Sequence, residues 1–187
     1  MGADQEQDCR LRETLRTGSI PVTIVMGSAR SDGNTAQTVQ AFLSSLALPA
    51  RLVDLNTLRI HPFEYARPDR EDDFRSVVEA MTAADDIVLA TPVYWYAMSG
   101  TMKVFFDRLT DILGDPIGRK LAGRCVSVLV SGTEEALPPG FHEPFESTAG
   151  YFGMSWKGIA YCRSQGGASL SMESLNPAVE LAMRLRS

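Results

Sequence analysis

The chain has 187 residues, which is enough for one domain with a full hydrophobic core and too few for two comfortable ones. Apolar residues make up 44% of it and charged residues 22%, close to the average of soluble globular proteins. Its net charge of -5 argues against a nonspecific nucleic-acid binder, which needs lysines and arginines to neutralise phosphates. Composition therefore predicts a single globular domain without a nucleic-acid partner.

The cysteines and the hydropathy restrict the setting in which the protein works. Cys9, Cys125 and Cys162 are odd in number and lack the spacing of a zinc site, which predicts neither a disulfide framework nor a metal. No run of about 18 apolar residues is present to span a bilayer. The polar N-terminus also lacks the basic start and apolar run of a signal peptide. The sequence predicts a cytoplasmic protein with no membrane partner.

Strands and helices are expected to alternate along the chain. Residues 1–18 carry many charges and little apolar surface, which predicts a flexible N-terminal extension, and the domain is expected over residues 19–187. Runs of β-branched residues mark strands, and apolar residues at helical spacing mark helices. In chain order the expected elements are strand 22–26, helix 34–46, strand 51–55, helix 74–81, strand 87–91, helix 102–112, strand 126–130, helix 141–152, strand 156–162 and a helix with Asn176 as N-cap and Pro177 in its first position.

Strict alternation predicts a parallel sheet, because a helical crossover lets consecutive strands run in the same direction. Five strands are too few for an eight-stranded barrel. The prediction is therefore an α/β three-layer sandwich with a five-stranded parallel sheet in the order 2-1-3-4-5. In that order the switch point lies between the first and third strands, where ligands bind, and residues 27–34 and 91–99 form the two loops there.

The first switch-point loop, residues 27–35, has the composition of a phosphate site. It leads into a helix, so its backbone N–H groups and the helix dipole attract an anion. The loop lacks the lysine of a Walker A motif and the third glycine of the dinucleotide fingerprint, which favours a monophosphate. The alternative is an ordinary polar turn capped by Asn34. Further donors come from the side chains of Ser28, Arg30, Ser31, Asn34 and Thr35.

The second switch-point loop places three aromatic residues, Tyr94, Trp95 and Tyr96, directly after Pro92 and Val93. The backbone amides of this turn could bond the polar edge of a planar ring, and Tyr94 or Trp95 could cover its face. The alternative for the aromatic residues is core packing or a subunit interface. Because both loops meet at one switch point, together they favour a flat cofactor with one terminal phosphate.

Residues 27–35 and 92–108 together resemble the flavodoxin-like NAD(P)H-dependent FMN reductases, and the likeness extends over about residues 20–165. The resemblance implies a flavodoxin-like fold and noncovalently bound FMN. On the phosphate side it implies contacts from Ser28, Arg30, Gly33, Asn34 and Thr35. Around the isoalloxazine ring it implies contacts from Pro92, Val93, Tyr94 and Trp95, with the loop Ser131, Gly132 and Thr133 closing the other side.

The same resemblance implies an activity. Hydride would pass from NADH or NADPH to FMN and on to a small acceptor: a quinone, a flavin, an azo or nitro compound, or a metal ion. No catalytic side chain is expected, because the cofactor carries the chemistry. Two alternatives remain: a flavodoxin-type electron carrier or FMN-binding redox sensor without NAD(P)H activity, and a cofactor-free interaction domain.

The resemblance also implies a homodimer or homotetramer, with the helix that follows Ser99 contributing to the interface. On that helix Lys103, Asp107 and Arg108 either lie in the interface or pair within the helix. One branch of the family carries a compact cysteine motif for an iron–sulfur cluster, but residues 60–66 contain no cysteine, so no cluster is expected. His61 is expected to be an ordinary loop histidine.

Overall fold

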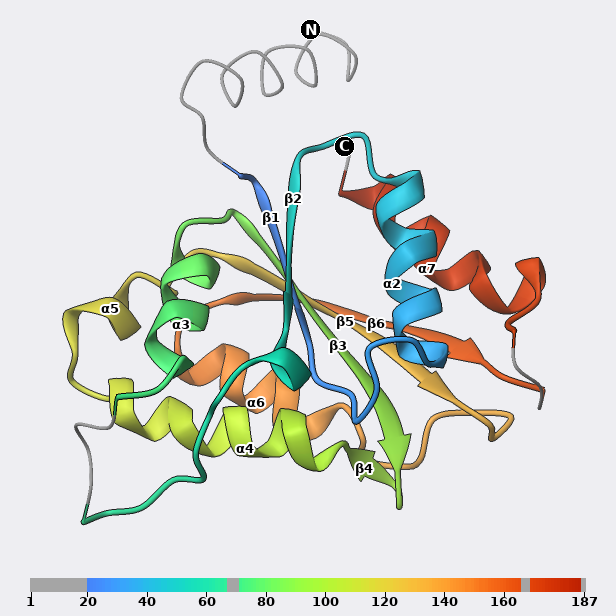
Figure 1. Ribbon diagram of the computed structural model, residues 1–187. Helices are drawn as coiled ribbons and strands as arrows, with labels where there is room; N and C mark the ends of the chain where they lie inside the picture. The colour runs from blue at the N-terminus through green and yellow to red at the C-terminus, as the bar shows by residue number, and fades with distance from the viewer. Residues whose placement is uncertain (1–19, 67–70, 166–168, 186–187) are drawn as a thin grey trace, which may run out of the picture.

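The computed structural model describes residues 20–66, 71–165 and 169–185, and the predicted extension at 1–18 lies outside these ranges. Five parallel strands lie in the order β2-β1-β3-β5-β6 (Figure 1). Numbered along the chain as parallel strands alone, this is the predicted order 2-1-3-4-5, which is confirmed. Their bounds are β1 Val22–Met26, β2 Ala50–Asp54, β3 Asp86–Tyr94, β5 Cys125–Gly132 and β6 Ser155–Arg163.

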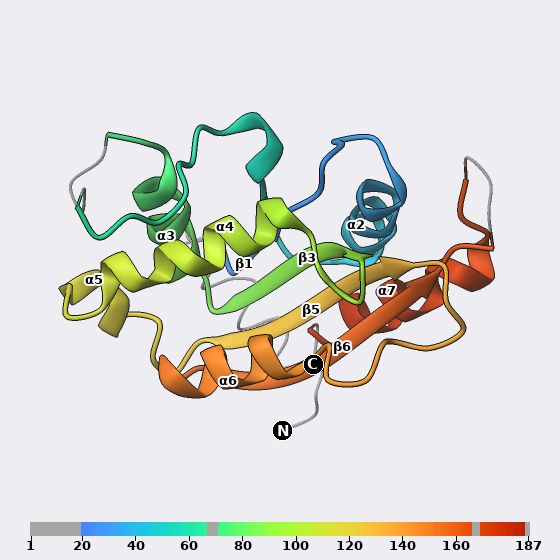
Figure 2. The same ribbon diagram turned by 90° about the horizontal axis from the view of Figure 1, so that it is seen from below.

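Helices cover both faces of the sheet, as Figures 1 and 2 show. Helices α2 and α7 pack on one face, and α3, α4 and α6 pack on the other. In the described ranges no helix is long and apolar enough to cross a bilayer. The helices are α2 Asn34–Ser45, α3 Phe74–Thr82, α4 Gly100–Arg108, α5 Pro116–Arg119, α6 Glu143–Tyr151 and α7 Met172–Arg184, with 3-10 turns η1 Leu55–Thr57 and η2 Leu109–Ile112.

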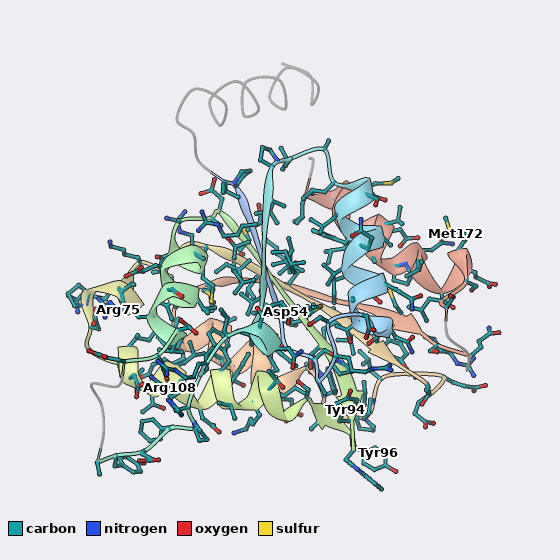
Figure 3. The ribbon with its side chains drawn as sticks, viewed as in Figure 1. Asp54, Arg75, Tyr94, Tyr96, Arg108 and Met172 are labelled. Atoms are coloured by element: carbon teal, nitrogen blue, oxygen red, sulfur yellow. The ribbon has the colours of Figure 1, made fainter. Side chains whose placement is uncertain are left out.

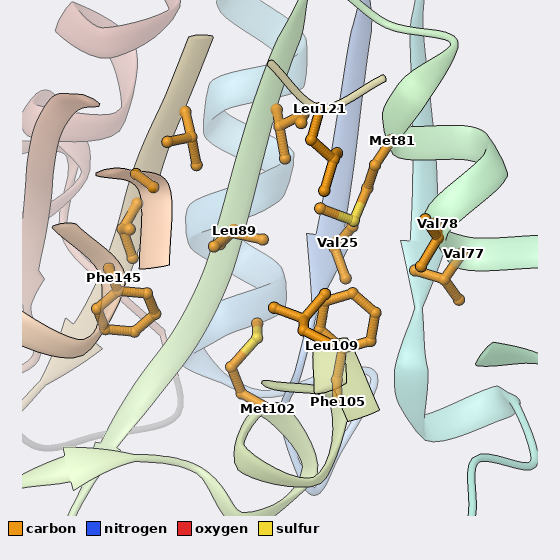
Figure 4. Close-up of a cluster of buried hydrophobic side chains, with 14 of the residues drawn as sticks. Val25, Val77, Val78, Met81, Leu89, Met102, Phe105, Leu109, Leu121 and Phe145 are labelled. Carbon is orange, nitrogen blue, oxygen red and sulfur yellow. The ribbon is translucent and has the colours of Figure 1, made fainter. Parts of the chain in front are cut away.

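The sheet divides the core into two apolar clusters. All five residues of β1 are buried, because helical crossovers cover a parallel sheet on both sides. Successive side chains of the strand alternate between the faces: Ile24 packs with α2 and α7, and Val25 packs with the opposite cluster. Figure 4 shows this second cluster, where Val25 and Leu89 of the sheet meet Met102 and Phe105 of α4. Helix α4 is thereby fixed beside the ends of β1 and β3.

The sheet has six strands, where the sequence predicted five. The sixth, β4 Ala97–Met98, pairs antiparallel with the end of β3, which continues to Tyr94, beyond its predicted end at Thr91. The prediction missed this hairpin because its two-residue loop, Trp95 and Tyr96, lacks the Asn-Gly type of sequence that favours such turns.

The start of the last helix was also predicted wrongly. Helix α7 begins at Met172, and its N-cap is Ser171, whose hydroxyl accepts a hydrogen bond from the N–H of Ser174. Pro177 therefore lies inside the helix, where it removes one backbone hydrogen bond of the second turn. The apolar face of Ala178, Leu181 and Ala182, fully or almost fully buried against the sheet, offsets that loss.

Candidate functional site

A cavity of about 150 Å³ opens at the carboxyl ends of β1, β3 and β5, and we call it the strand-end cavity. Such a position, outside the strand ends at the switch point, is where open α/β sheets bind ligands. It is lined by Ser28, Arg30, Gly33, Asn34, Thr35, Pro92, Val93, Tyr94, Ser131, Gly132 and Thr133. The structure thus brings together every residue predicted to bind the cofactor except Trp95, which does not line the cavity.

The N-terminus of α2 forms one wall of the strand-end cavity. Its N-cap is Gly33, not Asn34 as the capped-turn alternative supposed, and no side chain caps the first-turn N–H groups. The first turn contains no acidic residue. These N–H groups therefore keep their capacity to bind an anion, and the dipole of the helix favours one.

Arg30 folds back across this helix end. A Cβ atom on Gly33 would lie only 3.1 Å from a terminal guanidinium nitrogen of Arg30, so the cation rests directly over the glycine. Among the described residues that line the strand-end cavity, Arg30 is the one charged side chain. A guanidinium beside a helix N-terminus is suited to phosphate oxygens, which accept its N–H groups in pairs.

A buried pair of hydroxyls connects two walls of the cavity. Thr35 Oγ1 and Ser131 Oγ lie 2.8 Å apart, and each residue is 2% exposed. The bond joins the first turn of α2 to the end of β5, which are 96 positions apart in the chain. A hydroxyl has one donor and two acceptor positions, so each group keeps capacity for a ligand in the cavity.

Ser99 links the two switch-point loops. Its hydroxyl donates to the carbonyl oxygen of Gly27 at 2.7 Å and accepts from the N–H of Met102 at 3.1 Å, which makes it the N-cap of α4. Gly27 has no room for a side chain, since a Cβ there would lie 2.8 Å from the Cβ of Met102. Sequence reasoning placed Ser99 only at the start of a helix, although serine before a helix is a typical cap. The contact with Gly27 is tertiary.

The hairpin between β3 and β4 has a strained turn. Trp95 and Tyr96 have φ angles of 48° and 67°, the left-handed region, which a two-residue turn of this type requires at both positions. Trp95 is 91% exposed and Tyr96 is 71% exposed. Figure 3 shows Tyr96 extending from the body of the molecule, whereas Tyr94 lies at the end of β3. Trp95 lies outside the strand-end cavity, so its position does not support the predicted role of covering a face of the flavin ring.

Arg108, predicted to lie at an interface or to pair within its own helix, pairs with Asp111 three positions further on and is also buried. Its side chain is 4% exposed, and its guanidinium binds the carboxylates of Asp72 and Asp111, with the ring of Phe74 beneath it. Burial would lower the pKa of Arg108, but its hydrogen bonds to the two carboxylates raise it. Lys103 and Asp107, in contrast, form the exposed pair one turn apart that the sequence allowed.

The segment after β2 contacts the first switch-point loop. The amide of Asn56, in η1, donates to the hydroxyl of Ser31 in the first switch-point loop at 3.2 Å. Ser31 itself does not line the strand-end cavity. Among the described residues, no three histidine, cysteine, aspartate or glutamate side chains converge as a metal site would require.

The sequence matches a known family over most of its length. The model of the family described as NADPH-dependent FMN reductase matches residues 20–137. The protein YwqN of Bacillus subtilis (strain 168), which is named as an NAD(P)H-dependent FMN-containing oxidoreductase, is 28% identical over 176 residues. That similarity covers 88% of this chain and 95% of YwqN. Both findings agree with the resemblance seen in the two loop motifs.

Solved structures show the same fold at low sequence identity. A flavodoxin of the WrbA-like type from Agrobacterium tumefaciens superposes with a TM-score of 0.65 at 17% identity, covering 89% of this chain and 95% of its own. An FMN-dependent NADH-azoreductase from Bacillus anthracis, solved with FMN, superposes with a TM-score of 0.68 at 12% identity. The superposition covers 89% of this chain and 100% of the azoreductase chain. The fold is therefore flavodoxin-like, as predicted.

Proposed function

Because this chain belongs to the NADPH-dependent FMN reductase family, we propose that its strand-end cavity holds the FMN and that the enzyme reduces a small oxidised compound there. The protein is an NAD(P)H-dependent FMN oxidoreductase by family. The strand-end cavity is the main observation behind this proposal. Three loops that are distant in sequence, those at the ends of β1, β3 and β5, meet there beside the N-terminus of α2, which is suited to bind an anion.

The phosphate of FMN would bind at the N-terminus of α2. Uncapped N–H groups, the hydroxyls of Ser28 and Thr35, and the guanidinium of Arg30 supply donors, and no carboxylate lines the cavity in the described residues. A phosphate at such a helix end is stabilised by unpaired N–H donors and by the dipole together. The residues present therefore fit the terminal phosphate of the cofactor.

The flat ring would lie toward Pro92, Val93, Tyr94 and the loop after β5. Whole-cofactor pockets usually enclose about 300 to 1,000 Å³, more than this cavity does. One side of the ring would therefore remain accessible from solvent, where both substrates can reach it. Tyr94, which is 44% exposed, stands at this open side.

When bound, FMN would supply the redox chemistry, the transfer of a hydride from the nicotinamide and of its electrons to the acceptor. The side chains that line the strand-end cavity would bind and orient the cofactor. Two substrates that use one open side must do so in turn. We therefore expect initial-rate data with the parallel lines of a ping-pong mechanism, and intersecting lines would contradict a shared binding side.

The proposed electron acceptor is a small compound: a quinone, a free flavin, an azo or nitro compound, or a metal ion. The decisive experiment is an absorbance spectrum of the purified protein, followed by anaerobic addition of NADH and NADPH in separate samples. We expect a yellow protein that either nucleotide bleaches and that a quinone or azo compound reoxidises. A yellow protein that neither nucleotide bleaches would instead be an electron carrier, and a colourless protein that binds no added FMN would refute the assignment of the site.

We also propose a homodimer or homotetramer. A groove of about 320 Å³ runs between α6 and the end of α4 with η2, and it is lined mainly by apolar side chains such as Phe106, Leu109 and Phe152. Tyr151 and Leu113 at this groove are 71% and 46% exposed. We expect light scattering coupled to size exclusion to show an oligomer that Leu113→Arg converts to monomer. A monomeric wild-type protein would contradict the proposal.

A further inference from the structure

The loop that follows β5 is held through its carbonyl oxygens by the end of β6. The N–H of Ser164 donates to the carbonyl oxygen of Gly132 at 2.6 Å. The hydroxyl of Tyr161 donates to the carbonyl oxygen of Glu134 at 2.8 Å. Between them, Nε of Arg163 donates to the oxygen of Thr133 at 3.4 Å, a weaker contact. Three consecutive carbonyl groups of the loop are therefore turned toward the same neighbouring strand.

Peptide planarity gives this arrangement a second consequence. In a trans peptide the C=O and the next N–H point in opposite directions. The N–H groups of Thr133 and Glu134 are therefore turned away from β6, and of these two residues Thr133 lines the strand-end cavity. Within the described ranges neither N–H group has a hydrogen-bond partner in the protein.

Tyr161 is built closely into this contact. It lies opposite Val130 in the β5–β6 register, and its half-buried ring packs against the core. A Cβ atom on Gly132 would lie 2.7 Å from the tyrosine oxygen, so the hydroxyl fits there only over a glycine. An ordinary tyrosine hydroxyl is already protonated at neutral pH, and burial and the nearby Glu134 raise the pKa of Tyr161 further, so the hydroxyl is a donor there.

We propose that Tyr161, with Arg163, is a positioning residue of the flavin site: by anchoring the carbonyl group of Glu134 and packing over Gly132, it fixes the β5–α6 loop so that the N–H donor of Thr133 stays turned toward the strand-end cavity. The inference rests on the proposed function, because it requires FMN in that cavity. Donors fixed in advance stabilise negative charge without reorganising, so they favour a cofactor that gains electrons.

Tyr161→Phe in the holoenzyme tests this role. The substitution keeps the ring and its packing but removes the hydroxyl that holds Glu134. We expect FMN to bind about 3- to 10-fold more weakly, the effect of losing one hydrogen bond, and the midpoint potential of the bound flavin to become more negative. Tyr65→Phe removes a hydroxyl from a tyrosine that is 91% exposed and outside the site, and it should change neither quantity.

The midpoint potential of the bound flavin distinguishes a positioning role of Tyr161 from a purely structural one. A tyrosine with only a structural role would lower the melting temperature of the FMN-free protein but leave the potential and visible spectrum of the bound flavin unchanged. That result, or an unchanged FMN dissociation constant and potential in Tyr161→Phe, would overturn the inference while leaving the proposed function standing. A wild-type protein that binds no FMN would overturn both.

Discussion

Arg30 and Gly33 show how a single residue pair shapes the proposed anion site. The guanidinium of Arg30 lies over the N-cap glycine, where a Cβ would approach it to 3.1 Å. Glycine at this position therefore lets the cation approach the end of α2 while it leaves the first-turn N–H groups uncapped. The charge of Arg30 and the helix dipole would then act on the same anion in the proposed site.

Arg30→Ala should weaken FMN binding about 10- to 160-fold and leave the fold intact, because a charge-assisted contact to phosphate contributes about 1.5 to 3 kcal/mol. Titration of the FMN-free protein with FMN, followed by flavin fluorescence, measures the change. Arg51→Ala removes an exposed arginine from β2, away from the cavity, and serves as the matched control. An FMN dissociation constant equal to that of Arg51→Ala would remove Arg30 from the site.

At the scale of one element, the β3–β4 hairpin stores backbone strain beside the site. Two bulky residues, Trp95 and Tyr96, occupy the left-handed region, which costs about 1 to 3 kcal/mol for each residue that is not glycine. Their rings are mostly exposed, so burial of apolar surface offsets little of this cost. The hairpin is held instead by its pairing, Val93 with Met98 and Tyr94 with Ala97.

Replacing Trp95 and Tyr96 by Asn and Gly should stabilise the protein by about 1 to 2 kcal/mol, because these residues favour this turn type. Urea unfolding of the FMN-free protein measures the gain. FMN affinity should stay unchanged, since neither ring lines the strand-end cavity. The pair Trp95→Ala and Tyr96→Ala removes the rings without relieving the strain, so it should show no gain. Equal stability of both double variants would contradict stored strain.

At the scale of the whole molecule, a buried ionic cluster joins three parts of the chain. Arg108, labelled in Figure 3 at the end of α4, binds Asp72, which precedes α3, and the carbonyl oxygen of His61 in the segment after β2. The side chain of Asp72 is 1% exposed. Burial alone would raise the pKa of Asp72, but hydrogen bonds from Arg108 and from the N–H groups of His61 and Phe74 lower it below 3.8.

A folded-state pKa below the unfolded value means that ionised Asp72 stabilises the fold above about pH 4. This contribution is lost as the pH falls through the lowered pKa. Asp72→Asn should therefore lower the free energy of unfolding by about 3 kcal/mol at pH 7, because it removes one partner of a buried ion pair. The difference from wild type should shrink below about pH 4, as urea unfolding over a pH series would show.

Glu79→Gln is the matched control for this prediction. Glu79 pairs with Arg75 on α3, but both side chains are 60% exposed, so its replacement should change the unfolding free energy little at any pH. If the unfolding free energies of the wild-type protein and Asp72→Asn differ by the same amount at pH 3 and at pH 7, ionisation of Asp72 does not stabilise the fold.

The sequence by itself determined the alternation of strands and helices and the place of the two switch-point loops, because hydrophobic periodicity marks each element and strand ends of a parallel sheet meet at one edge. The strand order came from the commonest order of such sheets, and the loop Ser131, Gly132 and Thr133 came from the family resemblance. A strong β-branched run such as residues 22–26 needs no distant partner to be recognised. For the same reason the loop of residues 27–35 could be predicted to bind an anion from its own composition.

Only the tertiary structure decided what distant residues do to one another. The burial of Arg108 depends on Asp72, 36 positions away, and the hydrogen bond from Tyr161 to Glu134 joins residues 27 positions apart. Likewise Ser99 reaches Gly27 across 72 positions. Such contacts leave no periodic signal in the chain, since each depends on how whole strands and helices are placed. Local sequence therefore specified the elements of this protein, and their packing specified how the site is held.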